Sequence, residues 1–510
     1  MQLALSRVSY THPAAQDPIL NNVTISFPQG WTGLLGDNGC GKSTLARIAC
    51  GLLKPDSGSV TRGLVCAYCA QEADERPVRL DDFALDFDRE TRLLRDRLSL
   101  TDDMPWRWDC LSFGERKKLQ IACALWQHPD VLAIDEPTNH LDTPARRQLE
   151  GLLRDFGGIG ILVSHDRDLL DALVERCASF EATGAREGAK ITVRPGGYTA
   201  ARAQAELEHR TLAAERATAK SELARLAAER DARAHEAARA AARRSKRGLD
   251  PKDKSARSKI DLAIFTGQDG VRGRIATQMD RRLDTARDRV EGAFVAKRYD
   301  GDLFLDAEPS PRKTVLHVPA ARLPCGESAL DVPELYVGNT EHIGIVGPNG
   351  AGKTTFLDHA RSLLGISDGS RGLPSPCNGI PVLDIPQEPS AEQRERILAE
   401  MRGLSRAERG RVLSCVAQLN SDPDRILEGA RTSPGELRKL MIAVGILKAP
   451  ALIVMDEPTN HLDLHSVQAL ERALARFRGA LLLVSHDHTF LEACTSTTWR
   501  IEDGRLRPVR

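Results

Sequence analysis

A seven-residue segment, EPTNHLD, occurs twice in this chain, at residues 136–142 and again at 457–463. Ser112 lies 24 residues before Glu136, and Ser433 lies 24 residues before Glu457. A chain of 510 residues is too long for one hydrophobic core. The repetition therefore predicts two domains of one fold that flank a different segment. Three other pairs recur in the same order: GDNGCGKST (36–44) and GPNGAGKTT (347–355), LSFGE (111–115) and TSPGE (432–436), and LVSHD (162–166) and LVSHD (483–487).

Short apolar runs end at these repeated segments in both repeats. WTGLL, VLAI and GIGILV occur in the first repeat, and HIGIV, ALIVM and ALLLV occur in the second. Such runs are typical of fully buried parallel strands. Helical stretches lie between them, such as residues 42–53, which end before Pro55. This alternation predicts an α/β fold with ligands at the carboxyl ends of the strands.

Each repeat carries a G-x4-G-K-[S/T] segment that follows an apolar run and opens a helical stretch. A chance glycine-rich turn is the alternative, but two copies in this context favour a phosphate-binding loop. Lys42 and Lys353 would reach the outer phosphates of a nucleotide. Ser43 and Thr354 would ligate Mg²⁺. The candidate nucleotide-binding residues are Gly36, Asp37, Asn38, Gly39, Cys40, Gly41, Lys42, Ser43 and Thr44, and Gly347, Pro348, Asn349, Gly350, Ala351, Gly352, Lys353, Thr354 and Thr355.

A strand ends in two acids in each repeat, at VLAIDE and LIVMDE. Such a pair could be a solvated turn. Beside a phosphate loop, however, the first acid usually holds the metal, and the second polarises an attacking water molecule. We therefore predict metal-binding roles for Asp135 and Asp456 and catalytic roles for Glu136 and Glu457.

A histidine follows a further strand in each repeat, at His165 and His486. A lone histidine there is more often a hydrogen-bonded core residue. The 29-residue spacing from the glutamate is the same in both repeats, which favours a γ-phosphate contact. Ser112 and Ser433 precede helical stretches, where they could bind an anion or simply cap the helix.

A phosphate loop, a glutamine near a strand end (Gln71 or Gln387), an SxGE signature, an acid pair and a histidine, in this order, resemble ATP-binding cassettes. Two such cassettes in one chain without membrane segments resemble the ABC-F class. The EPTNHLD segment in both cassettes is a strong signature of that class. The resemblance implies cassette domains at residues 1–200 and 311–510, joined by an α-helical hairpin linker at 201–310. It also implies that ATP is bound and hydrolysed with Mg²⁺.

In this family the two cassettes close head to tail on two ATP molecules. Ser433 and Gly435 would then close the site of Lys42, and Ser112 and Gly114 would close the site of Lys353. Asp142 and Asp463 would face each other's cassettes. The residues expected around Mg²⁺ are Ser43, Gln71, Asp135, Thr354, Gln387 and Asp456.

An aromatic residue usually stacks on adenine about 25 residues before the phosphate loop in this family. Tyr10 suits that role in the first repeat. The corresponding segment of the second repeat, HVPAARLPCGE, has no Phe, Tyr or Trp. We therefore expect the two sites to differ in adenine contacts.

The segment from 201 to 310 is rich in Ala, Glu and Arg, which are strong helix formers. A second helical stripe is formed by Ile275, Met279, Leu283, Ala286, Val290 and Phe294. The two stretches should pack as an antiparallel hairpin, with a helix start at 250–251 and a turn at 267–270.

Residues 239–259, here the basic segment, hold nine Lys or Arg residues against two Asp, a net charge of +7. On charge alone, a solvated loop and a phosphate contact are equally favoured. The resemblance favours the contact, because the ABC-F linker reaches into the ribosome beside tRNA. The expected partner is thus the ribosome, through rRNA and tRNA, and no homodimer is needed because both cassettes are in one chain.

Composition bounds the alternatives. Net charge is +0, so affinity for nucleic acid must come from a local patch, and the scattered 11 cysteines fit a reducing cytoplasm. No run reaches the ~18 apolar residues of a membrane span, so no membrane insertion is expected. Two other functions stay open: the ATPase component of a membrane transporter and a DNA-associated cassette ATPase.

Overall fold

The computed structural model describes residues 1–13, 17–139, 141–182, 189–243, 268–292, 303, 305, 307–326, 328–366, 375–377, 379–421, 433–460 and 462–509. The chain divides into two compact units. One unit contains Met1–Ala201 and Arg298–Arg510, and the other contains Arg202–Lys297. Below, residues 1–201 are the first repeat and residues 298–510 are the second repeat. The domain limits at 200 and 310 stay predictions.

The first repeat contains nine strands among its described residues: β1 (Gln2–Tyr10), β2 (Leu20–Pro28), β3 (Gly30–Leu35), β4 (Ser57–Val60), β5 (Cys66–Cys69), β6 (Val131–Asp135), β7 (Ile159–Val163), β8 (Arg176–Ala182) and β9 (Ala189–Pro195). Its helices in the same described part are α1 (Lys42–Ala49), α2 (Leu80–Leu85), α3 (Arg89–Arg97), the 3₁₀ helix η1 (Met104–Cys110), α4 (Phe113–Trp126), α5 (Thr143–Arg154) and α6 (Arg167–Leu173).

The described strands of the second repeat are β10 (Thr314–Val318), β11 (Ala321–Cys325), β12 (Ser328–Val332), β13 (Leu335–Gly338), β14 (His342–Val346), β15 (Ser375–Cys377), β16 (Ile380–Ile385), β17 (Leu452–Asp456), β18 (Ala480–Val484), β19 (Thr497–Glu502) and β20 (Arg505–Val509). Its described helices are α10 (Lys353–Leu364), α11 (Ala391–Gly403), α12 (Arg406–Gln418), α14 (Pro434–Leu447), α15 (Leu464–Ala475) and α16 (His488–Cys494).

The main sheets of the two repeats have the same strand order. In the first repeat it is β5-β6-β7-β3-β8-β9, and the sheet of the second repeat contains β16-β17-β18-β14-β19-β20 in the corresponding order. All neighbours in these runs are parallel except the last pair, β8–β9 or β19–β20. The predicted α/β fold with buried parallel strands is therefore confirmed, and so is the relation between the repeats.

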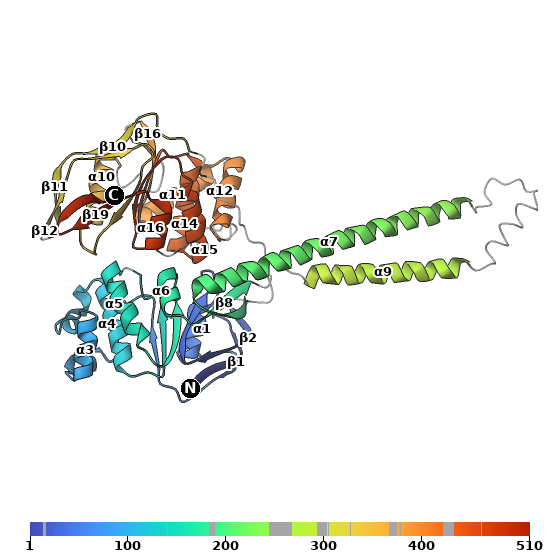
Figure 1. The fold of residues 1–510 in the computed structure, drawn as a ribbon, viewed down its shortest axis with the longest axis horizontal. Coiled ribbons are helices and arrows are strands. Elements are labelled where there is room, and N and C mark those ends of the chain that lie inside the picture. The colour runs from blue at the N-terminus through green and yellow to red at the C-terminus, as the bar shows by residue number, and fades with distance from the viewer. Residues whose placement is uncertain are drawn as a thin grey trace, which may run out of the picture. The chain divides into compact units, whose positions relative to one another are not determined.

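The central strands are buried on both faces, which explains their continuous apolar runs. Every residue of β6, β7, β17 and β18 is buried. Successive side chains point to opposite faces, so Leu132 and Ile134 join one core while Val131 and Ala133 join the other. Figure 1 shows the helices that cover these sheets. Because the sheets are packed on both faces, the free carboxyl ends of the strands are left to carry the polar segments.

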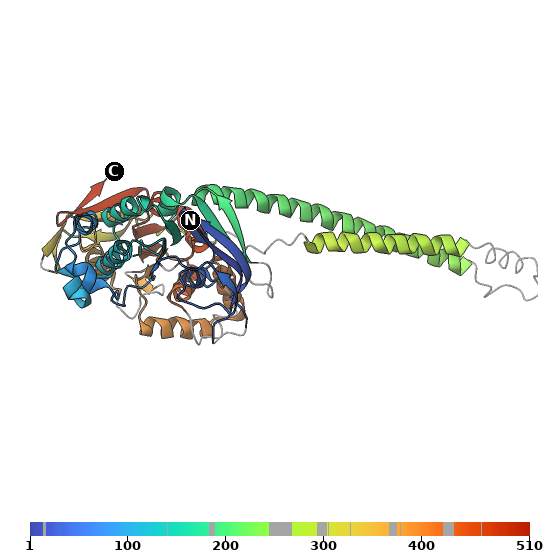
Figure 2. The same cartoon turned by 90° about the horizontal axis from the view of Figure 1, so that it is seen from below.

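The other compact unit contains most of α7 (Tyr198–Arg243) and α9 (Gln268–Gly292), which lie side by side in Figures 1 and 2. Leu226 of α7 packs with Met279, Leu283 and Ala286 of α9, so the predicted helical stripe is confirmed at these three positions. The side chains of Ile275 and Phe294 lie outside the described residues. The helix start expected at 250–251 lies outside them too. The turn expected at 267–270 is wrong from residue 268 onward, because α9 already includes Gln268 and tolerates Gly270 near its end.

Candidate active site

The two phosphate loops have the same geometry. Each follows a strand, β3 or β14, and opens a helix, α1 or α10. Gly41 and Gly352 cap these helices at φ 103° and φ 101°, a left-handed conformation that glycine adopts without a steric penalty. The Lys42 Nζ donates to Gly36 O (2.7 Å), and the Lys353 Nζ donates to Gly347 O (2.9 Å). The structural context predicted for both loops is confirmed.

The acid pairs lie at the carboxyl ends of β6 and β17. Asp135 and Asp456 are 2% exposed, and Glu136 and Glu457 are 5% exposed. Both glutamates have positive φ, 45° and 46°, which is uncommon for a residue with a Cβ. The same strained conformation thus occurs at the equivalent position of both repeats. Burial raises the pKa of Glu136 to about 8 and that of Glu457 to about 7. These values suit a group that exchanges protons near neutral pH.

The two histidines contact the glutamates in the same way but differ in their other partners. The backbone N–H of His165 donates to Glu136 Oε2, and that of His486 donates to Glu457 Oε2, both at 3.3 Å. Burial lowers the pKa of each imidazole to about 3, so both rings are neutral at physiological pH. His486 Nε2 also lies 3.2 Å from Lys353 Nζ and 3.1 Å from Asn349 Oδ1. His165 Nδ1, in contrast, is buried with no hydrogen-bond partner among the described residues.

The signature serines begin helices, as predicted. Ser112 caps α4 and Ser433 caps α14, each in a reciprocal capping box with the glutamate three residues later. The interpretation of these serines as helix caps is therefore confirmed. A capping serine can also bind an anion at the helix N-terminus, so the second role stays a prediction. Gly114 and Gly435 lie in the first turns of the same helices.

A cavity of about 370 Å³ joins the signature of the first repeat to the phosphate loop of the second. Ser112 and Gly114 therefore lie across from Lys353, the pairing that a head-to-tail arrangement requires. The lining residues are Ser112, Phe113, Gly114, Arg146, Cys325, Asn349, Gly350, Gly352, Lys353, Thr354, Thr355, Gln387, Asp456, Glu457, Asn460 and His486.

The two heptapeptide aspartates differ. Asp142 accepts a hydrogen bond from the backbone N–H of Asn349 (3.0 Å), so it reaches the phosphate loop of the other repeat as expected. Asp463 is hydrogen-bonded within its own repeat instead, with Lys439 Nζ at 2.7 Å and the Ser466 N–H at 2.9 Å. Asp463 nevertheless lies close enough to His165 of the first repeat to act on the pKa of that imidazole, which it raises against the larger lowering by burial. That Asp463 faces the first repeat stays a prediction.

The adenine-side residues differ as well. Tyr10 lies edge-on to His12, with ring centroids 5.2 Å apart, and His12 Nε2 lies 3.4 Å from Thr44 Oγ1 at the end of the phosphate loop. In the second repeat the hydroxyl of the equivalent Thr355 donates to Cys325 Sγ (3.7 Å). His12 and Cys325 were not singled out from the sequence, since neither belongs to a repeated segment.

Two buried cations were also missed. Lys117 is 0% exposed, and its Nζ donates to Asp135 O (2.8 Å), Gln71 O (3.4 Å) and Ala70 O. Arg438 is 1% exposed and donates to the backbone oxygens of Glu457 (3.1 Å) and Gln387. Each cation thus ties the signature helix to the glutamine segment and the acid pair. The signal in the sequence was a basic residue five positions after the signature serine in both repeats.

Comparison with known proteins agrees with this geometry. The family model described as ABC transporter matches residues 20–139 and 330–460. The probable ATP-binding protein YheS of Escherichia coli (strain K12) is 29% identical over 537 residues, which cover 96% of this chain and 77% of the relative. The ribosome protection protein VmlR of Bacillus subtilis is 29% identical over 523 residues, which cover 99% of this chain and 87% of the relative.

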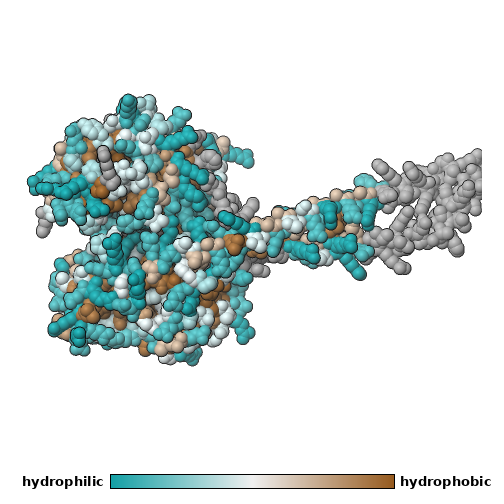
Figure 3. All heavy atoms as spheres, viewed as in Figure 1, coloured by the Kyte–Doolittle hydropathy of each residue, from teal (hydrophilic) through white to brown (hydrophobic). Residues whose placement is uncertain are grey.

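A solved structure titled RNase-L Inhibitor matches the fold with a TM-score of 0.60 and 18% identity, covering 99% of this chain and 90% of that one. Among the described residues, no helix combines the length and low polarity that a bilayer span requires. On the face seen in Figure 3, apolar residues are scattered among hydrophilic ones.

Proposed function

Because this chain belongs to the ABC-F class of tandem ATP-binding cassette proteins, which are ATPases, we propose that it is a ribosome-associated ATPase. Its cassettes, the two repeats, close on two ATP molecules and thereby position the linker near tRNA or rRNA. The observation that carries this proposal is the cavity in which the signature of one repeat meets the phosphate loop of the other. A site made by both repeats can convert ATP binding into movement of the linker between them.

The residues predicted around Mg²⁺ fit that ion, because all of them offer oxygen donors, which Mg²⁺ prefers. Thr354 hydrogen-bonds to Asp456, and Gln387 lines the same cavity. In the first repeat, Ser43, Gln71 and Asp135 form the corresponding set. Bound there, Mg²⁺ would neutralise charge on the β- and γ-phosphates of ATP.

In the proposed hydrolysis, Glu136 or Glu457 accepts a proton from a water molecule. The water oxygen bonds to the γ-phosphorus as the bond between that phosphorus and the bridging oxygen breaks. Lys42 and Lys353 would leave their loop carbonyls for the phosphates, and His165 and His486 would contact the γ-phosphate. Tyr10 would stack on adenine in the first site. The signature helix N-termini, Ser112 with Gly114 and Ser433 with Gly435, would hold the γ-phosphate from the opposite repeat.

The ribosome is proposed as the partner because VmlR is named a ribosome protection protein and aligns with 99% of this chain. The basic segment supplies a charge of +7 for phosphate contacts. A ribosomal partner also places the protein in the cytoplasm. A transporter role shares the ATP chemistry but has no use for a basic linker segment. A DNA-associated role could use both the ATP chemistry and the basic segment, and a comparison of duplex-DNA binding with ribosome binding tests it.

Neutralising three cations of the basic segment is expected to weaken ribosome association by about ten-fold or more at physiological salt, because each lost phosphate contact releases fewer counterions on binding. The salt dependence of binding should fall for the same reason. The measurement is co-sedimentation with ribosomes over a series of salt concentrations. The variant carries Lys252→Gln, Lys254→Gln and Arg257→Gln. A matched variant with three exposed cations of α7 replaced, Arg210→Gln, Lys220→Gln and Arg225→Gln, should retain association.

Equal loss in both triple variants would remove the basic segment from the proposal. If the wild-type protein never sediments with ribosomes but binds a membrane subunit or duplex DNA, the ribosome is not its partner. The proposed ATPase activity would be unaffected by that result.

A further inference from the structure

The two repeats differ four residues after the heptapeptide aspartate. Arg146 follows Asp142 in the first repeat, and Val467 follows Asp463 in the second. Both positions lie in equivalent helices, α5 and α15, which the aspartates cap. The guanidinium of Arg146 is a charged hydrogen-bond donor, whereas the isopropyl group of Val467 is apolar and donates nothing. The two ATP sites therefore differ at this equivalent position.

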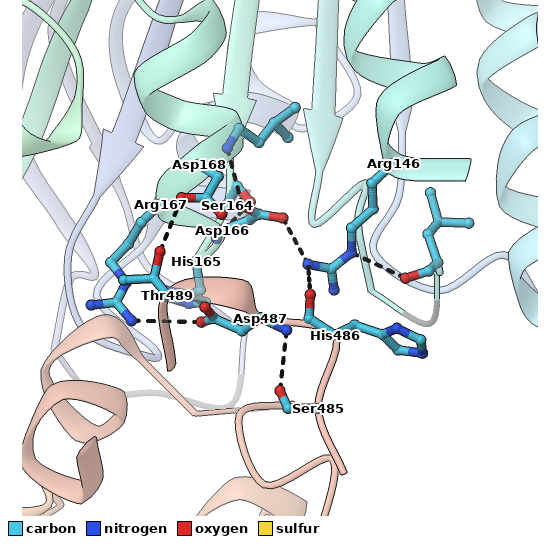
Figure 4. Close-up of polar contacts among 12 residues, drawn as sticks. Arg146, Ser164, His165, Asp166, Arg167, Asp168, Ser485, His486, Asp487 and Thr489 are labelled. Atoms are coloured by element: carbon cyan, nitrogen blue, oxygen red, sulfur yellow. Dashed lines mark hydrogen bonds and ion pairs between the residues drawn. The ribbon is translucent and has the colours of Figure 1, made fainter. Parts of the chain in front are cut away.

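Arg146 reaches across to the second repeat, as Figure 4 shows. Its Nη1 donates to the backbone oxygen of His486 (3.3 Å) and to Asp166 Oδ2 (3.1 Å). Its Nε donates to Leu141 O (3.0 Å), which fixes the side chain to its own repeat. The side chain also lines the cavity around Lys353 and Glu457. Arg146 thus links the first repeat to the His486 peptide through hydrogen bonds at both ends.

The His486 segment in turn holds the reacting groups of that site. Its N–H donates to Glu457 Oε2, and its imidazole contacts Lys353 and Asn349. Asp142 accepts a hydrogen bond from the Asn349 N–H. The first repeat therefore contacts both the His486 segment and the phosphate loop of the second repeat. Nearby, Arg167 pairs with Glu471 of the second repeat at 2.7 Å, which keeps the two surfaces together.

The Arg146 contact has no counterpart around Glu136, because Val467 stands at the equivalent position. Val467 is 3% exposed, packs in the core of its own repeat, and has no polar atom to offer His165. Asp463 is held by Lys439 inside the second repeat. The site of Lys42 therefore receives no counterpart of the arginine contact that the site of Lys353 receives.

We propose that Arg146 is a positioning residue that acts from the first repeat on the Glu457 site, and that the two ATP sites are consequently unequal, with Glu457 in the better assembled one. The proposal rests on the ATPase function and on the roles of Glu136 and Glu457 given above. Arg146 orders the His486 peptide and, through it, Glu457 and Lys353. It acts on the assembled, closed site, so its removal should lower kcat far more than it changes KM.

The test measures steady-state ATP turnover in single-site backgrounds. With Glu136→Gln, turnover reports the Glu457 site, and adding Arg146→Val should lower kcat about ten-fold or more while KM changes less than about three-fold. With Glu457→Gln, turnover reports the Glu136 site, and the fall on adding Arg146→Val should be at least about five-fold smaller. Arg147→Val is the matched control, because Arg147 is the exposed neighbour on the same helix. Arg146→Lys, which keeps one cationic donor, should recover part of kcat and guards against a folding defect in Arg146→Val.

Equal falls in the two backgrounds, an equal fall with Arg147→Val, or a change in KM alone would overturn the proposal. Wild-type turnover by the Glu136→Gln, Glu457→Gln double variant would overturn the roles of the glutamates and this proposal with them. Loss of ribosome binding with these ATPase differences intact would contradict only the proposed target.

Discussion

Replacing Glu136 and Glu457 together by glutamine is expected to lower ATP turnover by about 10²–10⁴-fold, the range in which a positioned proton acceptor contributes. Glutamine has nearly the same shape as glutamate but cannot take a proton from water. Both glutamates are buried at the strand ends, 5% exposed, so solvent cannot substitute for them. The phosphate loops are unchanged, and ATP should still bind. The measurement is phosphate release at saturating ATP.

The same variant should accumulate on ribosomes in the presence of ATP, because cassettes that close and cannot hydrolyse ATP stay closed. Co-sedimentation of wild type and variant compares their occupancy directly. A control with Glu215→Gln and Glu492→Gln removes two exposed carboxylates instead and should behave as wild type. Turnover that survives the double substitution within a few-fold would show that another group accepts the proton.

Replacing Lys439 by methionine is expected to destabilise the second repeat by about 3–5 kcal/mol, the usual cost of leaving one member of a buried ion pair without its partner. Lys439 Nζ lies 2.7 Å from Asp463 Oδ2, and the two side chains are 3% and 2% exposed. Asp463 has further hydrogen bonds from Ser466, but these alone do not neutralise a buried carboxylate. Denaturant unfolding of the nucleotide-free protein measures the loss.

The equivalent lysine of the first repeat provides the control. Lys118 is only partly buried and donates to Leu98 O (3.0 Å), so Lys118→Met should cost about 1 kcal/mol. Adding Asp463→Leu to Lys439→Met should recover part of the stability, since an apolar pair needs no charge compensation. If Lys118→Met and Lys439→Met lowered the free energy of unfolding equally, the Lys439–Asp463 ion pair would contribute no more to stability than the Lys118 hydrogen bond.

The same pair predicts a pH dependence with a definite sign. Burial alone would raise the pKa of Asp463, but Lys439 and the Ser466 hydrogen bonds lower it below its usual value. A depressed pKa stabilises the folded state above the pKa of the unfolded chain, and that contribution is lost as pH falls through the folded pKa. The stability difference between wild type and Lys439→Met should therefore shrink in acid.

The sequence by itself determined the parts of this protein that depend on local pattern. A strand buried on both faces must be apolar throughout, so the runs before each phosphate loop and acid pair were recognisable. The loop at Gly41 or Gly352 needs a left-handed residue before a helix, so its glycines and lysine occur at fixed spacing. Repetition of these segments then revealed two domains of one fold and the family to which they belong.

Only the tertiary structure decided what crosses between the repeats. Identical heptapeptides carry Asp142 and Asp463, yet Asp142 reaches the other phosphate loop while Asp463 pairs with Lys439. The difference comes from which neighbours each carboxylate meets in three dimensions. Arg146 likewise looks like an ordinary helical cation until the fold places it against His486. Contacts between segments hundreds of residues apart have no local signature, because their free energy depends on burial and on partners that only the folded chain assembles.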